Sequence, residues 1–195
     1  KTYNGVAIIS KQPASDIITD VPGLDDPQRR ILGATIDGVR VLNLYVVNGQ
    51  EVGSEKYAHK LHWLEKVTEH IGEQLKQHER FVVVGDFNIA PDDRDVYDPQ
   101  AWHERILCST PEREALQKIL DLGLTDSFRQ FEQAAESYSW WDYRAAGFRR
   151  NRGLRIDLIL ASKTLADDCS ACTIDKEPRR LERPSDHTPV IAEFK

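Results

Sequence analysis

Short apolar runs alternate with polar stretches along the chain, and one long segment carries apolar residues at every third or fourth position. The run Phe81-Val82-Val83-Val84 is largely β-branched and predicts a strand that is buried on both faces of a sheet. Residues 31–36 and 39–47 predict two further strands, and Asp37-Gly38 between them is the strongest short hairpin signal. We therefore expect a sheet with residues 81–85 as its central strand.

The apolar spacing also predicts two helices. Residues 54–77 form the first, because their apolar side chains fall on one stripe and Ser54 can cap the amino end. Residues 111–122 form the second, with Thr110 as its cap and Pro111 at its first position. The stripe of the first helix consists of Leu61, Leu64, Val67, Ile71 and Leu75.

The strand–helix–strand order around the central strand predicts an α/β fold, with a right-handed crossover if the two strands are parallel. Of the adjacent Trp140 and Trp141, we expect one to be a buried anchor. The remaining segments are expected as strands at 5–10, 155–161, 171–174 and 188–194, a loop or weak edge strand at 11–28, a long polar loop at 91–109 and an arginine-rich surface loop at 147–153.

Candidate chemistry begins where the central strand ends, at Gly85-Asp86-Phe87-Asn88. Positions i and i+2 of an extended stretch point to the same side, so Asp86 and Asn88 would face one crevice. The carboxyl ends of strands are where open α/β sheets place their ligands. The alternative is a plain turn in which both side chains bond nearby backbone, since this tetrapeptide is good turn chemistry.

Three other segments carry polar groups in strand-like surroundings. Asp157 lies inside an apolar run, and a buried carboxylate is costly unless it is paired or bound to metal. Asp186 and His187 form an acid–imidazole pair that leads into a strand. Tyr45 and Asn48 stand at the end of an earlier strand, where Tyr45 could equally be a half-buried strand aromatic.

In this order, the motifs resemble the endonuclease/exonuclease/phosphatase superfamily, and above all its exonuclease III branch of apurinic/apyrimidinic endonucleases. That branch has a tyrosine after a strand, then Gly-Asp-x-Asn, then Arg-hydrophobic-Asp, then Ser-Asp-His. Val47 departs from it, because the branch usually has proline there. The segments that carry the resemblance are 5–9, 28–30, 45–49, 85–88, 139–144, 151–157 and 185–187.

The resemblance implies a two-layered β-sandwich flanked by helices, of the deoxyribonuclease I type, that is incomplete at its N-terminus. Residues 1–195 would form a single domain, the C-terminal two-thirds to three-quarters of the family's domain. The strands expected before residue 5, and the glutamate that is the family's principal metal ligand, would be missing from the chain.

The resemblance also assigns roles around a scissile phosphate. Asp86 would orient or deprotonate the attacking water, and Asn88 would hold that water or a phosphate oxygen. His187 would donate a hydrogen bond or a proton to a phosphate oxygen, since the pKa of histidine lies close to working pH. Asp157 would brace His187, as the acid does in a Ser-His-Asp triad, although a structural ion pair is the alternative. Tyr45 would contact the phosphate.

Asn48 is expected at the phosphate as well. Asp86, Asn88 and Asp186 would provide oxygen ligands of the kind that Mg²⁺ or Mn²⁺ prefers. Without the family's glutamate, this chain alone would bind the metal poorly.

The substrate implied by the resemblance is DNA. Trp140, Leu154 and Ile156 match a hydrophobic pocket that admits a sugar without a base, and Arg149 and Arg152 would contact the backbone. The expected function is a Mg²⁺-dependent repair nuclease that cleaves 5′ to abasic sites and degrades double-stranded DNA from 3′ to 5′. The alternatives are a superfamily phosphatase acting on inositol phosphates or lipid head groups, and a catalytically inactive fragment.

Composition modifies this picture in two ways. The net charge of −6 is unusual for a DNA-binding protein, so local basic clusters would have to supply the phosphate contacts, unless those clusters are solvated loops. The three cysteines suit a reducing compartment, and we expect a cytoplasmic monomer with no membrane partner. The basic clusters are Arg144, Arg149, Arg150, Arg152 and Arg155, followed by Arg179, Arg180 and Arg183.

Overall fold

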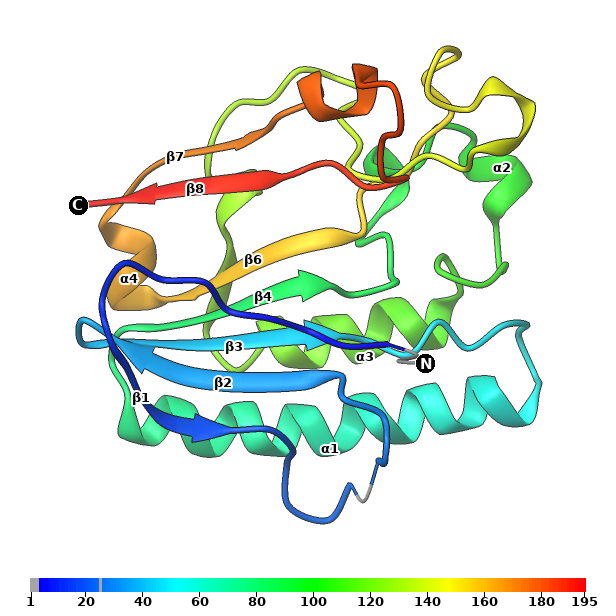
Figure 1. Cartoon of the computed structure of the whole chain (residues 1–195). Coiled ribbons are helices and arrows are strands. Elements are labelled where there is room, and N and C mark those ends of the chain that lie inside the picture. Colours follow the sequence, from blue (N-terminus) through cyan, green and yellow to red (C-terminus); the bar gives the residue numbers. More distant parts are fainter. Residues whose placement is uncertain (1–3, 25) are drawn as a thin grey trace.

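The computed structural model describes residues 4–24 and 26–195 and contains two sheets (Figure 1). The larger sheet has the strand order β1-β2-β3-β4-β6-β5, and β7 and β8 pair in a second sheet. The strands are β1 (Ala14–Ile18), β2 (Ile31–Ile36), β3 (Val39–Tyr45), β4 (Phe81–Asp86), β5 (Leu124–Asp126), β6 (Asp157–Ser162), β7 (Cys169–Ile174) and β8 (Val190–Phe194). The helices are α1 (Glu55–Gln77), α2 (Pro99–Trp102), α3 (Thr110–Leu120) and α4 (Lys163–Asp167).

Strand β4 is central, as its apolar run predicts. It pairs in parallel with β3 and antiparallel with β6. Val83 packs into the cluster beneath α1 and α3, whereas Val82 packs into a cluster on the opposite face, so both faces are covered. The predicted hairpin between β2 and β3 is confirmed, with Ile36 opposite Val39.

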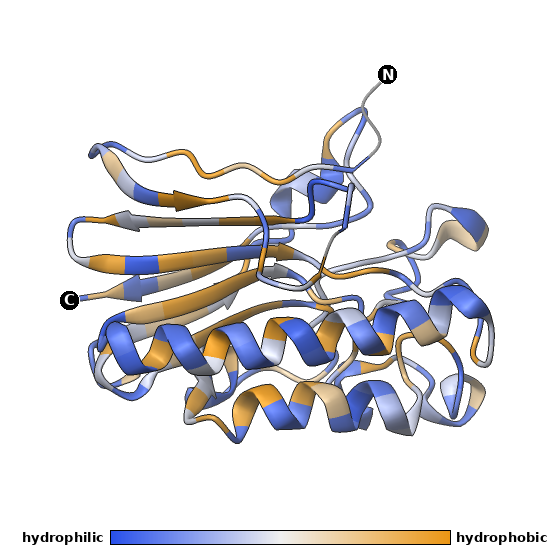
Figure 2. Ribbon diagram, turned by 90° about the horizontal axis from the view of Figure 1, so that it is seen from below, coloured by the Kyte–Doolittle hydropathy of each residue, from blue (hydrophilic) through white to orange (hydrophobic). Residues whose placement is uncertain are grey.

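Helices α1 and α3 lie side by side over one face of the large sheet, with polar positions turned outward (Figure 2). Ser54 caps α1 as predicted, since its hydroxyl accepts a hydrogen bond from the Tyr57 amide at 3.2 Å. The cap of α3 is Ser109, not the predicted Thr110. Ser109 donates from its amide at 3.1 Å and its hydroxyl at 2.6 Å to the Glu112 carboxylate, which makes Thr110 the first helical residue.

The small β7–β8 sheet lies on the other side of the large sheet, which gives the expected two layers with helices outside. Phe194 of β8 packs there against the cluster that contains Val82, Ala161 and Leu165. Within the described ranges, no helix combines the length and the apolarity needed to cross a membrane.

The amino-terminal part differs from the expectation. Residues 5–10 form no strand, and the Asn43 side chain donates to the Ala7 carbonyl at 2.9 Å. A strand requires a neighbour to complete its hydrogen-bond ladder, and an apolar run alone does not supply one. The edge strand of the large sheet is instead β1, within the segment 11–28 that was expected to be a loop or a weak edge strand.

Candidate functional site

The register of the large sheet brings the predicted carboxylates together. Tyr45 is paired with Asp86 across β3 and β4, and Asp86 is paired with Asp157 across β4 and β6. Gly85 permits this close approach. Its φ is +130°, and a Cβ atom there would lie 2.0 Å from the Leu44 carbonyl oxygen. Only glycine fits this position at the end of the strand.

After β4, the chain turns sharply so that Asn88 folds back on the strand. Asn88 has a φ of 49°, and its amide donates to Asp86 Oδ1 at 2.8 Å. Its side-chain nitrogen donates to Asp86 Oδ2 at 3.0 Å and to the Val46 carbonyl at 2.9 Å. Its side-chain oxygen accepts from Asn48 Nδ2 at 3.0 Å. Asp86 and Asn88 therefore face one crevice, and the local turn that was the alternative is the device that positions them.

His187 reaches the same crevice from the segment before β8. Its Nδ1 lies 2.9 Å from Asp157 Oδ2, and its Nε2 lies 3.9 Å from Asp86 Oδ2. A short ladder holds these strand ends together, because Trp140 forms bridges with both Leu154 and His187.

Charge and burial shift the ionisation of the two groups that face each other. Burial, together with the Asp157 charge, raises the pKa of Asp86 to about 7. Burial lowers the pKa of His187, but the hydrogen bond and charge of Asp157, with the charges of Asp86 and Asp186, outweigh it and raise the pKa to about 9. The imidazole is therefore a charged donor at neutral pH, and Asp86 titrates close to neutrality.

These groups surround a cavity of about 270 Å³. Leu154 does not line it and lies fully buried in a cluster that also includes Trp140 and Ile156. Arg149 and Arg152 are exposed on the segment between Trp141 and β6 and lie outside the lining. The lining consists of Tyr45, Asn48, Asp86, Asn88, Leu107, Trp140, Ile156, Asp186 and His187.

The donor set suits a metal ion. Ligand atoms of Asp86, Asp157 and His187 all lie within 4.8 Å of one another, and because His187 is a charged donor paired with Asp157, the carboxylates are the groups that could hold an ion. Asp186 offers a further carboxylate, one oxygen of which accepts from Trp140 Nε1 at 3.0 Å. The raised pKa of Asp86 marks a site where buried negative charges face each other, and a bound cation would relieve that repulsion.

Two of the arginines in the basic clusters are structural. Arg155 is fully buried, and its guanidinium pairs with Asp95 at 2.6 Å and with Asp126 at 2.7 Å. It therefore belongs to the core and not to a surface patch. Arg179 is also buried, over the rings of Trp141, Tyr143 and Phe148. The exposed arginines are Arg144, Arg149, Arg150, Arg152, Arg180 and Arg183.

Sequence reasoning missed three residues that shape this site. Leu107 lines the cavity from the loop before α3. Ser139 is buried, and its hydroxyl accepts from the amides of Ile156 and Asp157 at 3.1 Å each. Lys60 is buried beneath the two asparagines. The only indication of its burial in the sequence is that Lys60 lies four residues before Leu64 and therefore on the apolar face of α1.

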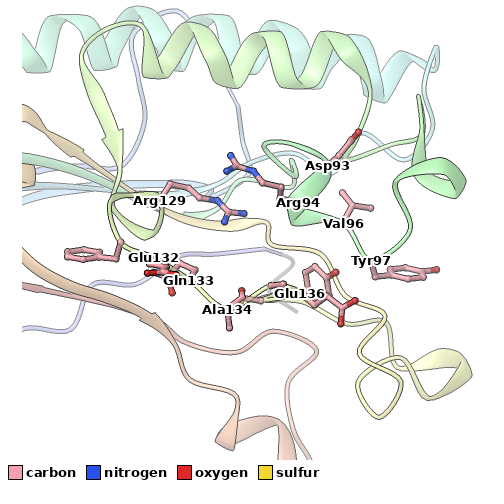
Figure 3. Close-up of a pocket in the computed structure, with 13 residues that line it drawn as sticks. Asp93, Arg94, Val96, Tyr97, Arg129, Glu132, Gln133, Ala134 and Glu136 are labelled. Atoms are coloured by element: carbon pink, nitrogen blue, oxygen red, sulfur yellow. Dashed lines mark hydrogen bonds between the residues drawn. The ribbon is translucent and has the colours of Figure 1, made fainter.

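A separate hollow of about 550 Å³ is lined by other residues (Figure 3). Its walls mix basic Arg94 and Arg129 with acidic Glu132 and Glu136. None of the cavity residues around Asp86 and His187 contributes to it, so this hollow is separate from the candidate site.

A two-layered α/β sandwich with an acid-braced histidine and clustered carboxylates at its strand ends defines a phosphodiester hydrolase of the deoxyribonuclease I type. The model of the Endonuclease/Exonuclease/phosphatase family matches residues 1–187, and the chain belongs to that family.

Similar proteins extend this assignment. Exodeoxyribonuclease III of Haemophilus influenzae is 38% identical, over 100% of this chain and 78% of that protein. Among solved structures, the 3′ phosphatase NExo from Neisseria bound to product DNA hairpin has a TM-score of 0.94 and 49% identity, over 95% of this chain and 73% of that one. An AP endonuclease from Archaeoglobus fulgidus has a TM-score of 0.89 and 35% identity, over 95% of this chain and 72% of that one. The resemblance to the exonuclease III branch is confirmed.

Proposed function

We propose that this protein is a cation-dependent DNA repair nuclease, which hydrolyses the phosphodiester 5′ to an abasic site and removes nucleotides from 3′ ends of double-stranded DNA. The convergence of Asp86, Asn88 and the Asp157–His187 pair on one small cavity carries the proposal. The similar proteins support DNA as the substrate, since they are described as an exodeoxyribonuclease, an AP endonuclease and a phosphatase bound to a DNA hairpin.

Hydrolysis requires a water to attack phosphorus, and Asp86 is placed to orient that water and take its proton. Asp86 lines the cavity at the carboxyl end of β4, next to Tyr45 and Asn88. Asn88 holds Asp86 through two hydrogen bonds, and its second side-chain N–H donates to the Val46 carbonyl, so Asn48 is left to present its amide group to the water or to a phosphate oxygen.

The transition state gains negative charge on the phosphate oxygens. His187 donates from Nε2 to one of these oxygens, while Asp157 holds its Nδ1 and keeps the ring charged. Tyr45 lines the same cavity and donates its phenol hydroxyl to the phosphate. The bond from phosphorus to the 3′ oxygen breaks, the 3′ oxygen takes a proton from solvent, and the products are a 3′ hydroxyl and a 5′ phosphate.

Asp86, Asn88 and Asp186 would hold Mg²⁺ or Mn²⁺ through oxygen atoms, which are the ligands these ions prefer. When bound, the cation supplies Lewis-acid stabilisation of the phosphate charge.

Cavity size supports selection of a sugar that lacks its base. Trp140 and Ile156 form its apolar wall, and Leu154 packs behind them. A cavity of about 270 Å³ is small for a full nucleotide, and extrusion costs least where no base is stacked or paired. Arg149 and Arg152 lie on an exposed segment and would contact the flanking phosphates. We further propose that the protein is a monomer and that it acts in the cytoplasm; its few cysteines suit such a reducing compartment.

The test uses three labelled DNA duplexes, one with an internal abasic site, one with a 3′ hydroxyl end and one with a 3′ phosphate end, each with Mg²⁺ or with EDTA. We expect incision 5′ to the abasic site in the presence of Mg²⁺ and none in the presence of EDTA. Release of inorganic phosphate from the third duplex would add 3′-phosphatase activity to the same site. Turnover of inositol phosphates without cleavage of any duplex would overturn DNA as the substrate.

A further inference from the structure

A buried lysine lies directly beneath the cavity. Lys60 of α1 has no exposed surface, and its ammonium donates to the Asn88 carbonyl at 2.7 Å and to the Asn48 carbonyl at 3.2 Å. Its third contact is the carboxylate of Glu112 on α3, which is also fully buried. The three donors of one ammonium are thus used within the protein.

The partner carboxylate is itself held on all sides. Glu112 accepts from the Leu107 amide at 3.1 Å and from the Ser109 amide at 3.1 Å and hydroxyl at 2.6 Å. The Tyr57 hydroxyl lies 2.7 Å from the Ser109 hydroxyl. Since a buried charge is tolerated only when its partners are complete, this network compensates the charge of the buried ammonium.

The backbone is shaped around the lysine stem. Gly49 has a φ of +87°, and a Cβ atom there would lie 3.0 Å from Lys60 Cδ. The segment that carries Asn48 therefore wraps closely over the stem, so the side chain and the loop fit each other.

A buried ion pair is weak evidence for stability, because apolar residues of the same volume often replace such pairs without loss. The contacts of Lys60 indicate a different purpose. Two of the three go to the carbonyls of Asn48 and Asn88, whose side chains bond to each other at 3.0 Å and line the cavity.

We propose that Lys60 is a positioning residue for phosphodiester hydrolysis. It ties the loop after β3 to the turn after β4 and so sets the distance between the two asparagine amides. The inference rests on the proposed function, since it gives Asn48 and Asn88 their task, and its effect reaches the substrate only through them.

The kinetic test compares the two halves of one ion pair. Lys60→Met removes the donors to both carbonyls, whereas Glu112→Gln leaves those donors in place and removes only the negative charge of the third contact. Each variant should lower Tm. At a temperature where both are folded, Lys60→Met should lower kcat on the abasic duplex by about 10²-fold with KM nearly unchanged, because small misplacements of reacting groups are costly. Glu112→Gln should keep kcat within about threefold of wild type.

Lys76→Met is the matched control, because Lys76 is an exposed lysine on the same helix and should give wild-type kinetics. Equal losses of kcat in Lys60→Met and Glu112→Gln would overturn the proposal and make Lys60 a stability residue. A wild-type kcat in Lys60→Met would also overturn it.

A second measurement does not depend on activity. In NMR spectra, the Asn88 side-chain NH₂ protons should exchange slowly in wild type and Lys76→Met and faster in Lys60→Met, because the turn after β4 is no longer held. Unchanged exchange in folded Lys60→Met would refute the positioning role. If the wild-type protein cleaves no DNA, the proposed function fails, and this exchange still decides whether Lys60 orders the asparagines.

Discussion

At the scale of single residues, the site is defined by how each charge is accommodated. Asp86 and Asp157 face each other across paired strands, which is unfavourable unless a cation intervenes. His187 provides a positive charge between them, 2.9 Å from Asp157 and 3.9 Å from Asp86. The imidazole is therefore part of the electrostatic balance of the folded state and also the donor we assign to the phosphate.

This balance predicts a dependence of stability on pH in the absence of metal. The folded state raises the pKa of Asp86 from 3.8 to about 7, so it binds more protons than the unfolded state over that range, and its stability must fall as pH rises from about 4 to 7. The stability that His187 contributes is fully present below pH 6.5 and is lost as pH rises through about 9.

Asp86→Asn should reduce the loss of stability between pH 4 and 7 and leave the loss that follows the titration of His187 at higher pH. The measurement is the urea midpoint in EDTA at several pH values, followed by circular dichroism. A variant profile parallel to that of wild type across the whole range would contradict the assigned ionisation of Asp86.

A second prediction concerns Asp157 and His187 as one unit. Each alanine variant should lower the cleavage rate by about 10²–10³-fold, the cost of one lost charge-stabilising donor. The double variant should be no slower than His187→Ala alone, because a brace has no effect once the group that it braces is gone. Single-turnover rates measure this. Multiplicative losses would show that Asp157 acts elsewhere, for instance on the metal.

At the scale of elements, the site depends on how closely β3 and β4 approach. Gly85 is the point of closest contact, and Gly85→Ala would force its new Cβ atom into the Leu44 carbonyl. We expect a loss of about 2–4 kcal/mol in unfolding free energy, together with loss of activity. Gly38→Ala is the control, because Gly38 also has positive φ but open space around it, and it should cost about 1 kcal/mol. If urea titrations give the two variants the same loss of unfolding free energy, the end of β4 can adjust to a side chain at position 85.

Elements with a strong local pattern could be predicted from the sequence. The hairpin of β2 and β3 and the central β4 carry their signal within a few consecutive residues, and helix α1 carries it as a regular apolar spacing along one segment. The cap of α3 was missed although its signal was local, because Ser109 and Glu112 form a capping box one residue before the predicted Thr110. The prediction of a strand at residues 5–10 was wrong, because a local apolar pattern does not show whether a neighbouring strand is available for pairing.

The same distinction holds for the candidate site. Asp86, Asn88 and His187 could be singled out as polar groups next to strands, and Asp157 as a carboxylate inside an apolar run. The family resemblance then supplied their roles. Lys60 could not be singled out, since its only mark is a charge on an apolar stripe. Arg155 was assigned to a basic surface because its partner Asp95 lies far away in sequence, and only the fold brings them together.

At the scale of the whole molecule, the net charge of −6 leaves DNA binding to a few local contacts. Arg155 and Arg179 are buried, and among the arginines that remain exposed we propose those of residues 149–152 as phosphate contacts. Each phosphate contact releases counterions, so binding to duplex DNA should weaken steeply as salt rises.

Replacing Arg149, Arg150 and Arg152 by alanine should weaken binding and reduce the slope of log Kd against log salt by about two to three. The control variant replaces Arg94 and Arg113, which pair with nearby aspartates, and so removes two positive charges elsewhere on the surface. Fluorescence anisotropy across a salt series measures the slope. An unchanged slope in the triple variant would place the DNA on another face.

The ladder that joins Ser139 and Trp141 to the residues around His187 has a consequence for biosynthesis. The Thr188 amide donates to the Ser139 carbonyl at 2.8 Å, and the Trp141 amide donates to the Asp186 carbonyl at 3.0 Å. In the order of translation, the segment of His187 is the last of the site segments to leave the ribosome, long after Tyr45 and Asp86. A nascent chain therefore lacks the His187 imidazole at the site until that segment docks.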